Sequence, residues 1–158
     1  MKACFLGLGY IGLPTAIIAA KNGGIDVIGV DINPKVVDMT NAGKLHIVEP
    51  GIGDMLREVV NKGKLRAATT PEVSDAYFIV VPTPFKGDHQ PDVSYVEAAT
   101  RSVIPLLKEG DLFVIESTSP VGTTEQMADI IFGERPELKG KIYIAYCPER
   151  VLPGNVIY

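Results

Sequence analysis

Three glycines and one aspartate near the amino terminus have the residue types and the spacing needed to bind a phosphate-linked nucleotide. Gly7, Gly9 and Gly12 form a G-x-G-x-x-G pattern, and Asp31 follows about twenty residues later. The first glycine permits a tight turn, the second lets the backbone approach a pyrophosphate, and the third lets a helix pack against a strand. An anion is then held at the positive end of that helix. The pattern predicts a dinucleotide site.

The cofactor that these residues predict is NAD. We expect the N–H groups around Tyr10 and Ile11 to face the pyrophosphate, and the carboxylate of Asp31 to accept hydrogen bonds from the adenosine ribose. The charge of Asp31 would repel a 2′-phosphate, so NAD is favoured over NADP, although the nearby Lys35 weakens this preference. The alternative is a glycine turn that only closes a strand–helix unit.

Regular elements at the start of the chain must position these groups. Residues 2–6 form an apolar run of strand length, and residues 11–22 have helical composition and end at a pair of glycines. A second apolar strand over residues 27–30 ends in the aspartate, and a helix over residues 34–40 follows it. These segments predict a βαβ unit with the nucleotide at the strand ends.

The rest of the chain continues the alternation of strands and helices. Expected helices cover residues 51–61, 71–74, 93–108 and 122–132, expected strands cover residues 65–68, 76–81, 112–116 and 142–146, and residues 82–91 form a polar loop. This order predicts an α/β fold: a doubly wound, six-stranded parallel sheet, the Rossmann fold. We expect residues 1–150 to form this domain. Residues 151–158 would begin the connection to the central and C-terminal domains of a longer enzyme.

Composition excludes several classes of protein. The 15 basic and 19 acidic residues give a net charge of −4, the wrong sign for binding nucleic acid. The uncharged stretch at residues 3–20 is interrupted by glycines and a proline, so we expect no membrane segment. Cys4 and Cys147 lack metal-ligand spacing, and His46 and His89 are expected to orient loops, so no metal site is predicted. A reducing cytoplasm fits best.

Polar residues follow the fourth, fifth and sixth expected strands, where the ligand crevice of an open parallel sheet lies. Thr83, Thr118 and Glu149 stand at these positions. The two hydroxyls could reach a cofactor ribose or a catalytic water, and the glutamate could hold or deprotonate a water. The structural alternatives are that Thr118 or Ser119 caps the next helix, and that Glu149 is a solvated loop acid.

Six segments resemble the amino-terminal domain of the nucleotide-sugar 6-dehydrogenases: GLGYIGLP, VDIN, HIVEP, VPTPFKGDHQPD, ESTSPVGTT and AYCPERVLPG. The resemblance spans essentially the whole chain and is greatest with the UDP-N-acetyl-D-mannosamine branch. HIVEP, PFKGDH and CPERV are its most branch-specific parts. UDP-glucose relatives carry a second acid where this sequence has Pro153, and this departure also favours the N-acetylmannosamine branch.

The resemblance implies an activity and a set of site residues. Enzymes of this family oxidise the C6 alcohol of a UDP-sugar to a carboxylate in two hydride transfers, with NAD as the acceptor. The resemblance implies cofactor contacts at Tyr10, Ile11, Asp31, Thr83 and Thr118, substrate contacts at Glu149, Arg150 and Val151, and catalytic roles for Thr118 and Glu149. Glu149 matches a family glutamate credited with acid–base or water-positioning work.

The resemblance also implies that other parts of the enzyme are needed. The family's nucleophilic cysteine, in a Gly-Gly-x-Cys context, lies in a later domain, and Cys4 and Cys147 are not substitutes for it. We therefore expect residues 1–158 to bind NAD weakly and to oxidise nothing. The expected partner is a UDP-sugar, with no nucleic acid and no membrane. The full-length enzyme is expected to form a homo-oligomer through segments outside this chain.

Three alternatives remain at this stage. The substrate could be UDP-glucose or UDP-N-acetylglucosamine instead. A non-catalytic NAD-sensing module would share residues 7–31 but would need no polar cluster beyond the fifth and sixth strands. A methyltransferase that binds S-adenosylmethionine would also be glycine-rich after the first strand, but the third glycine opening a helix at Gly12 argues against it.

Overall fold

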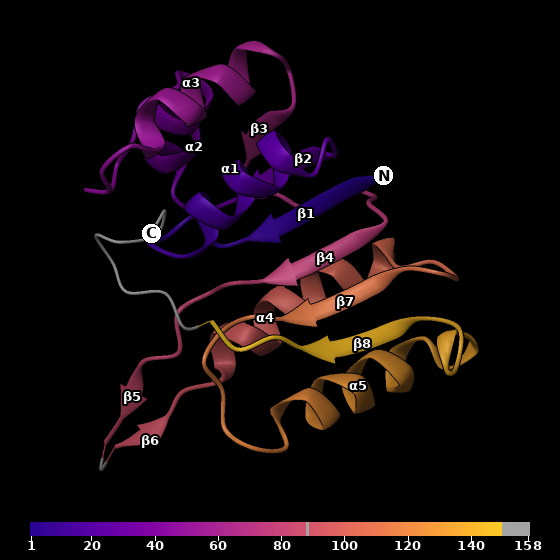
Figure 1. The fold of residues 1–158 in the computed structure, drawn as a ribbon. Helices are drawn as coiled ribbons and strands as arrows, with labels where there is room; N and C mark the ends of the chain where they lie inside the picture. The colour runs from indigo at the N-terminus through magenta and orange to yellow at the C-terminus, as the bar shows by residue number, and fades with distance from the viewer. Residues whose placement is uncertain (88, 150–158) are drawn as a thin grey trace.

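The computed structural model describes residues 1–87 and 89–149. Within these residues, six parallel strands form one sheet in the order β3-β2-β1-β4-β7-β8 (Figure 1). The strands are β1 (Lys2–Leu6), β2 (Asp26–Val30), β3 (Leu65–Ala68), β4 (Ala76–Ile79), β7 (Leu112–Ile115) and β8 (Tyr143–Tyr146). The chain runs from β1 outward to β3, returns to β4 beside β1, and continues to the opposite edge. The expected doubly wound parallel sheet is confirmed.

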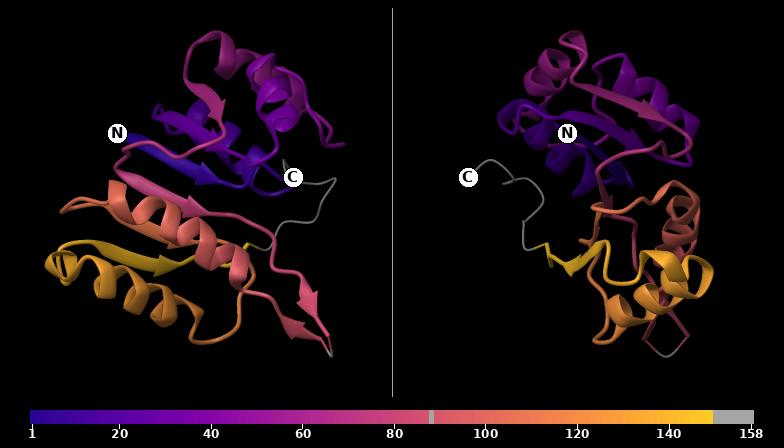
Figure 2. Two further views of the ribbon diagram at one scale, coloured as in Figure 1. Left: turned by 180° about the vertical axis from the view of Figure 1, so that it is seen from behind. Right: turned by 90° about the vertical axis from the view of Figure 1, so that its right-hand side faces the viewer.

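Helices connect the strands and cover both faces of the sheet. They are α1 (Gly12–Asn22), α2 (Pro34–Asn41), α3 (Ile52–Asn61), α4 (Ser94–Val103) and α5 (Thr123–Glu134). Phe5 of β1 packs with Ile17 of α1 in one buried apolar cluster, whereas its neighbour Cys4 packs with Val96 of α4 and Met127 of α5 in the other. Successive residues of a strand point to opposite faces, so one apolar strand contributes to both clusters. Seen from behind, α4 passes in front of β4 and β7 (Figure 2).

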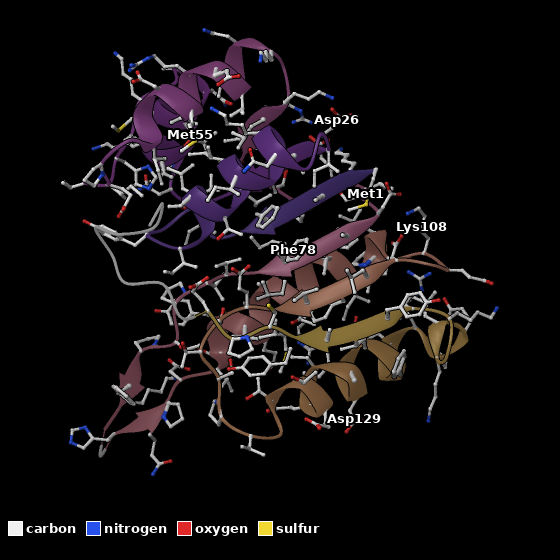
Figure 3. The ribbon with its side chains drawn as sticks, in the orientation of Figure 1. Met1, Asp26, Met55, Phe78, Lys108 and Asp129 are labelled. Carbon is white, nitrogen blue, oxygen red and sulfur yellow. The ribbon has the colours of Figure 1, made fainter. Side chains whose placement is uncertain are left out.

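Aromatic stacking helps to join the two central strands. The rings of Phe5 and Phe78 are stacked with their centroids 4.5 Å apart, and they bring β1 and β4 together on one face of the sheet. Phe78 lies in the middle of the sheet, whereas Met1, Asp26 and Lys108 lie where the strands begin (Figure 3). The opposite edge, where the strands end, is left for the polar residues that follow them.

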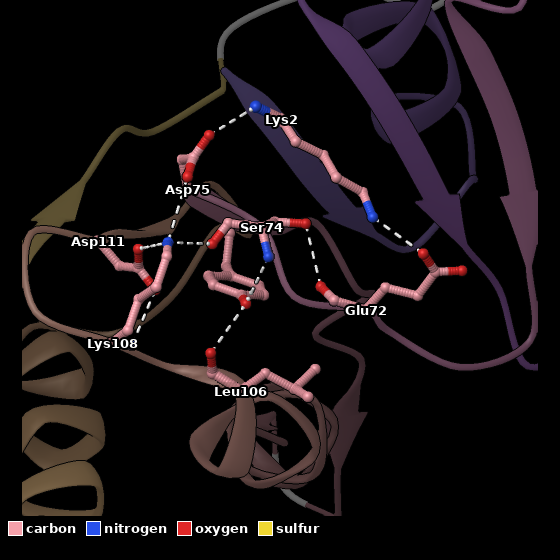
Figure 4. A network of polar contacts seen from close by, with 8 residues as sticks. Lys2, Glu72, Ser74, Asp75, Leu106, Lys108 and Asp111 are labelled. Atoms are coloured by element: carbon pink, nitrogen blue, oxygen red, sulfur yellow. Dashed lines mark hydrogen bonds and ion pairs between the residues drawn. The ribbon is translucent and has the colours of Figure 1, made fainter.

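A polar network fixes the edge of the sheet where the strands begin (Figure 4). The backbone N–H of Lys2 donates to Asp75 at 2.8 Å, and the ammonium of Lys108 donates to the carbonyl of Ser74 at 3.0 Å. Lys108 also pairs with the buried carboxylate of Asp111. Because these contacts join the first residue of β1 to the segments that precede β4 and β7, they hold the starts of these strands together.

Several local predictions are wrong. Residues 71–74 form no helix, because Glu72 pairs with Lys2 and Arg66 and holds the segment as a connection between β3 and β4. The helix expected over residues 93–108 ends at Val103 and gives way to a 3₁₀ turn (Ile104–Leu106), since the ring of Pro105 cannot continue an α-helix.

The expected loop at residues 82–91 contains a short antiparallel hairpin, β5 (Phe85–Lys86) and β6 (Gln90–Pro91). The hairpin projects away from the main sheet (Figure 1). The strand expected over residues 76–81 ends at Ile79, and the strand expected over residues 112–116 ends at Ile115. The residues just after these two strands are therefore free to face a ligand.

Candidate functional site

A cleft of about 870 Å³ lies at the carboxyl ends of the strands. Most of its walls come from the residues that directly follow β1, β2, β4, β7 and β8, and α4 closes one side. The lining residues that bear on chemistry are Gly7, Gly9, Tyr10, Ile11, Asp31, Thr83, Glu116, Thr118 and Glu149. The strand order reverses between β1 and β4, so the cleft lies at the position where open parallel sheets bind their ligands.

The three glycines of the pattern have different physical roles. Gly7 has a φ of 103°, and a Cβ there would lie 2.5 Å from the carbonyl oxygen of Val80. A Cβ at Gly12 would lie 1.9 Å from the carbonyl oxygen of Gly7, so both positions require glycine for the turn to pack. A Cβ at Gly9 would meet nothing within 4 Å. Gly9 therefore borders open space, where a phosphate could approach the backbone closely.

The amino terminus of α1 suits an anion. Its N-cap residue is Ile11, with no side-chain cap hydrogen bond and no acidic residue in the first turn. Helix starts of this kind leave backbone N–H groups for a ligand, and the helix dipole favours a negative charge there. Tyr10 and Ile11 line the cleft beside this helix start. The residues present fit the pyrophosphate of a dinucleotide.

Asp31 lies in the cleft wall next to the glycine turn. Its Oδ2 accepts a hydrogen bond from the backbone N–H of Leu8 at 3.1 Å, and its Oδ1 accepts one from the N–H of Asn33 at 2.9 Å. These two bonds fix the carboxylate, and each oxygen keeps capacity to accept from a ribose hydroxyl. Lys35 does not line the cleft, so its expected effect on cofactor preference has no structural support.

The threonines after β4 and β7 are joined to each other. The hydroxyl of Thr83 donates to the carbonyl oxygen of Thr118 at 2.6 Å, and the hydroxyl of Ser117 donates to the carbonyl of Val81 at 2.7 Å. Both loops therefore face the cleft as one unit. The N-cap of α5 is Gly122 without a side-chain cap, so the alternative that Thr118 or Ser119 caps this helix is wrong.

Glu116 is a site residue that the sequence reasoning missed. It follows β7, lines the cleft and is 7% exposed. Burial raises the pKa of its carboxyl to about 7, and the adjacent carboxyl of Glu149 adds to this rise. Sequence reasoning placed Glu116 inside the strand. The signal that could have found it is the one used for Asp31, an acid that ends an apolar parallel strand.

The two histidines have different surroundings. Nε2 of His46 forms a hydrogen bond with the carbonyl oxygen of Leu8 at 2.7 Å, which confirms the expectation that His46 orients a loop, here the glycine turn. His89 is exposed in the hairpin, where its ring meets Phe85 edge-on with the centroids 6.1 Å apart. Neither histidine lines the cleft.

The cysteines take no part in the cleft. Cys4 is buried inside β1, as expected of a small core residue, and burial raises the pKa of its thiol to about 12. Cys147 is exposed, and both thiols are free. Among residues 1–87 and 89–149, no group of His, Cys, Asp and Glu could hold a metal ion. No helix in this described part is long and apolar enough to cross a bilayer.

The predicted site residues of this chain therefore fall into three groups. The structure brings Gly7, Gly9, Tyr10, Ile11, Asp31, Thr83, Thr118 and Glu149 together around one cleft. Gly12 supports the turn from beneath. The expected substrate contacts Arg150 and Val151 lie outside the described residues, as does the expected connection at residues 151–158.

Comparisons with known proteins agree with this geometry. Residues 1–158 match the UDP-glucose/GDP-mannose dehydrogenase family, NAD binding domain. The UDP-N-acetyl-D-mannosamine dehydrogenase of Campylobacter jejuni is 55% identical over 165 residues, which cover 99% of this chain and 40% of that protein. The NDP-N-acetyl-D-galactosaminuronic acid dehydrogenase of Ralstonia nicotianae is 53% identical over 160 residues, 96% of this chain and 38% of that protein.

A solved structure of a related dehydrogenase is also similar to this chain in fold and sequence. The UDP-N-acetyl-mannosamine dehydrogenase of Staphylococcus aureus superposes with a TM-score of 0.92 at 43% identity, covering 98% of this chain and 38% of that one. The chain thus spans about 40% of the length of the curated relatives it matches. The expected resemblance and the expected cofactor, NAD, are both confirmed. The chain belongs to the UDP-glucose/GDP-mannose dehydrogenase family and corresponds to its NAD-binding domain.

Proposed function

We propose that this chain is the NAD-binding domain of a UDP-N-acetyl-D-mannosamine 6-dehydrogenase, which oxidises the C6 alcohol of the sugar to a carboxylate in two hydride transfers. The observation that carries the proposal is the single cleft that joins the glycine turn and Asp31 to Thr118 and Glu149. A nucleotide site and a set of acid–base residues share the same walls.

The adenosine half of NAD is assigned to the part of the cleft beside β2. Asp31 would accept hydrogen bonds from the ribose, and the start of α1 beside Gly9 would hold the pyrophosphate. The bound cofactor supplies the hydride acceptor. Tyr10, Ile11 and Thr83, which line the same cleft, are assigned as further cofactor contacts.

The acid–base work is assigned to the residues after β7 and β8. Thr118 is exposed in the cleft wall and is positioned by the Thr83 hydroxyl, which donates to its carbonyl oxygen at 2.6 Å. The hydroxyl of Thr118 would hold a water or a substrate hydroxyl. The carboxylate of Glu149 would accept a proton from the substrate hydroxyl or orient the water. Arg150 and Val151 are assigned to the substrate on the family resemblance alone.

The sugar is the least constrained part of the proposal. A UDP-N-acetyl-D-mannosamine dehydrogenase is 55% identical to this chain, but a dehydrogenase named for NDP-N-acetyl-D-galactosaminuronic acid is 53% identical. Pro153, which stands where UDP-glucose relatives carry an acid, favours an N-acetylated sugar. UDP-glucose and UDP-N-acetylglucosamine are the competing substrates.

We infer that residues 1–158 bind NAD without oxidising a UDP-sugar, and that the longer enzyme is a homo-oligomer. The domain would comprise residues 1–150, followed by the connection at residues 151–158. The support is that the curated relatives are about two and a half times as long as the matched region, which covers 38–40% of them. We also assign the enzyme to the cytoplasm, because Cys4 and Cys147 are free thiols.

The test is NADH production by the longer enzyme with UDP-N-acetylmannosamine, UDP-glucose and UDP-N-acetylglucosamine, each supplied separately at the same concentration. We expect the highest kcat/KM with UDP-N-acetylmannosamine, and no NADH from residues 1–158 alone. Preference for another sugar would overturn the substrate assignment. Tight NAD binding by the longer enzyme with no turnover of any of the three sugars would favour an NAD-sensing module instead.

A further inference from the structure

The carboxyl groups of Glu116 and Glu149 meet in the wall of the cleft. Glu116 follows β7 and Glu149 follows β8, and these two strands are neighbours in the sheet. The backbone N–H of Cys147 donates to the carbonyl oxygen of Ile115 at 2.9 Å, which keeps the two strand ends in register beyond β8. This placement brings the two carboxyl groups close enough for Glu149 to raise the pKa of Glu116, both through its charge and as a hydrogen-bond partner.

A hydrogen bond between two carboxyl groups needs a proton, because an ionised carboxylate can only accept. Glu116 is 7% exposed, so it is the member of the pair that water stabilises least. On its other side, the hydroxyl of Thr15 in α1 lies 3.4 Å from its Oε1. The charge of Glu149 repels a negative charge on Glu116 and raises the pKa of its carboxyl. Two negative charges at this place are therefore unfavourable, and one shared proton removes the repulsion.

The pair lies on the side of the cleft that is opposite Asp31. Asp31 follows β2, whereas Glu116 follows β7, and β1 and β4 stand between these strands. Neighbouring strands are about 4.8 Å apart, so the two acids are separated by roughly 14 Å along the sheet edge. A dinucleotide that spans the crevice with its adenosine at Asp31 extends its nicotinamide half toward Glu116. The carboxyl pair is thus placed where the redox half of the cofactor and the substrate meet.

We propose that Glu116 is a positioning residue that carries one proton and donates it to Glu149, so that the two form a single-proton acid–base unit. The donated hydrogen bond fixes the orientation of the Glu149 carboxylate, so that it faces the hydroxyl or water from which it accepts a proton. This use of the unit rests on the proposed dehydrogenase function, whereas the shared proton does not. The pKa of Glu116, about 7, means that the unit keeps its proton up to neutral pH.

The shared proton is tested by carbon NMR of the 158-residue chain with its glutamate side-chain carboxyls labelled with ¹³C, titrated from pH 3 to pH 10 (about the range these groups span). We expect the Glu116 and Glu149 signals to move together near pH 7, because one proton belongs to both. Glu116→Gln should abolish this step. Glu149→Gln should lower the Glu116 midpoint but leave it above the ordinary glutamate value, since it removes the like charge and leaves the burial.

Glu109→Gln is the matched control, because Glu109 is an exposed glutamate whose partner, Lys141, is also on the surface. It should leave the step near pH 7 unchanged. Independent titration of both carboxyls in the ordinary glutamate range would overturn the proposal, as would a Glu116 midpoint that Glu149→Gln does not move. Should Glu116→Gln fail to fold, Glu149→Gln still decides between these results.

The role of the pair is tested separately in the longer enzyme. We expect Glu116→Gln to change the pH dependence of kcat while KM for NAD stays within about twofold, because Gln can still donate a hydrogen bond to Glu149 but cannot titrate. An unchanged pH profile would reject the role in acid–base chemistry. The NMR titration needs neither NAD nor a sugar. A shared proton in the 158-residue chain, together with no UDP-sugar oxidation by the longer enzyme, would therefore refute the proposed function and still support the carboxyl pair.

Discussion

The backbone N–H of Leu8 donates a hydrogen bond to Oδ2 of Asp31 at 3.1 Å. This contact joins the glycine turn after β1 to the acid after β2, so the turn and the carboxylate are held as one structure. The ring of His46 bonds the carbonyl of the same Leu8 at 2.7 Å, which fixes the next peptide unit of the turn. The nucleotide site is therefore preorganised by contacts that do not need the nucleotide.

Replacement of glycines in the turn should separate folding from binding. Gly12→Ala places a Cβ 1.9 Å from a backbone oxygen, so we expect a loss of stability of about 2 kcal/mol or more, together with loss of NAD binding. Gly9→Ala meets nothing within 4 Å, so its stability should stay within about 0.5 kcal/mol of the parent while NAD affinity falls. Urea unfolding and calorimetry measure the two effects. Equal loss of stability in both variants would contradict these roles.

Removal of the charge of Asp31 should change cofactor choice. Asp31→Asn replaces one of the two acceptor oxygens by an NH2 donor, so one of the two backbone N–H groups loses its acceptor and we expect NAD affinity to fall about tenfold or more. The preference for NAD over NADP should shrink, because the repulsion of a 2′-phosphate is gone. Asp26→Asn is the control, since Asp26 begins β2, the strand that Asp31 follows, and pairs with Lys64 on the surface. If the two variants bind NAD equally well, Asp31 does not hold the ribose.

Burial of Glu116 should make the stability of the chain depend on pH. The pKa of Glu116 is raised from 4.5 to about 7 in the folded chain, so between these values the folded state holds a proton that the unfolded state has released. The free energy of unfolding should therefore fall as pH rises through this window, by up to about 3 kcal/mol at about 1.4 kcal/mol per unit. Glu116→Gln should remove this part of the slope. The measurement is urea unfolding of both proteins from pH 4 to pH 8, about one unit beyond the window on the alkaline side. The same slope in both proteins would show that Glu116 does not contribute to the pH dependence.

The hydroxyl of Thr83 should matter more than its methyl group. It donates to the carbonyl oxygen of Thr118 at 2.6 Å and so joins the loops that follow β4 and β7. Thr83→Val removes the bond, leaves a carbonyl without its donor, and should lower stability by about 1 kcal/mol and weaken NAD binding. Thr83→Ser keeps the hydroxyl and should restore both properties. Identical behaviour of the two variants would show that the bond contributes nothing.

The elements that surround the nucleotide site could be predicted from local sequence. The apolar runs at β1 and β2, the glycine pattern and the Asn33 cap each act within a few residues, and the side chain of Asn33 does accept from the N–H of Lys35 at 3.0 Å. The helix expected at residues 71–74 does not form, because this segment is fixed by a distant contact and not by its local sequence. Its conformation depends on Glu72 contacting Lys2, which is 70 residues away in the sequence. No local pattern contains that information.

The site itself could be predicted only in part. The threonines and Glu149 were found because each directly follows an apolar strand, and parallel strands end at the same edge. The pairing of Glu116 with Glu149 could not be predicted, because it depends on β7 and β8 being neighbours and on the depth to which the cleft buries each side chain. The hydrogen bond between Thr83 and Thr118 joins two loops that are 35 residues apart, so it could not be predicted from local sequence either.

The central claim is that a dinucleotide binds with its phosphates at the start of α1 and its adenosine ribose on Asp31. The most direct test is calorimetry of the 158-residue chain with NAD, NADP and S-adenosylmethionine, repeated on Gly9→Ala. We expect NAD to bind with one site, NADP to bind more weakly, S-adenosylmethionine to give no heat, and Gly9→Ala to lose NAD binding while remaining folded. Binding of S-adenosylmethionine with no heat from NAD, or undiminished NAD binding by folded Gly9→Ala, would contradict the account.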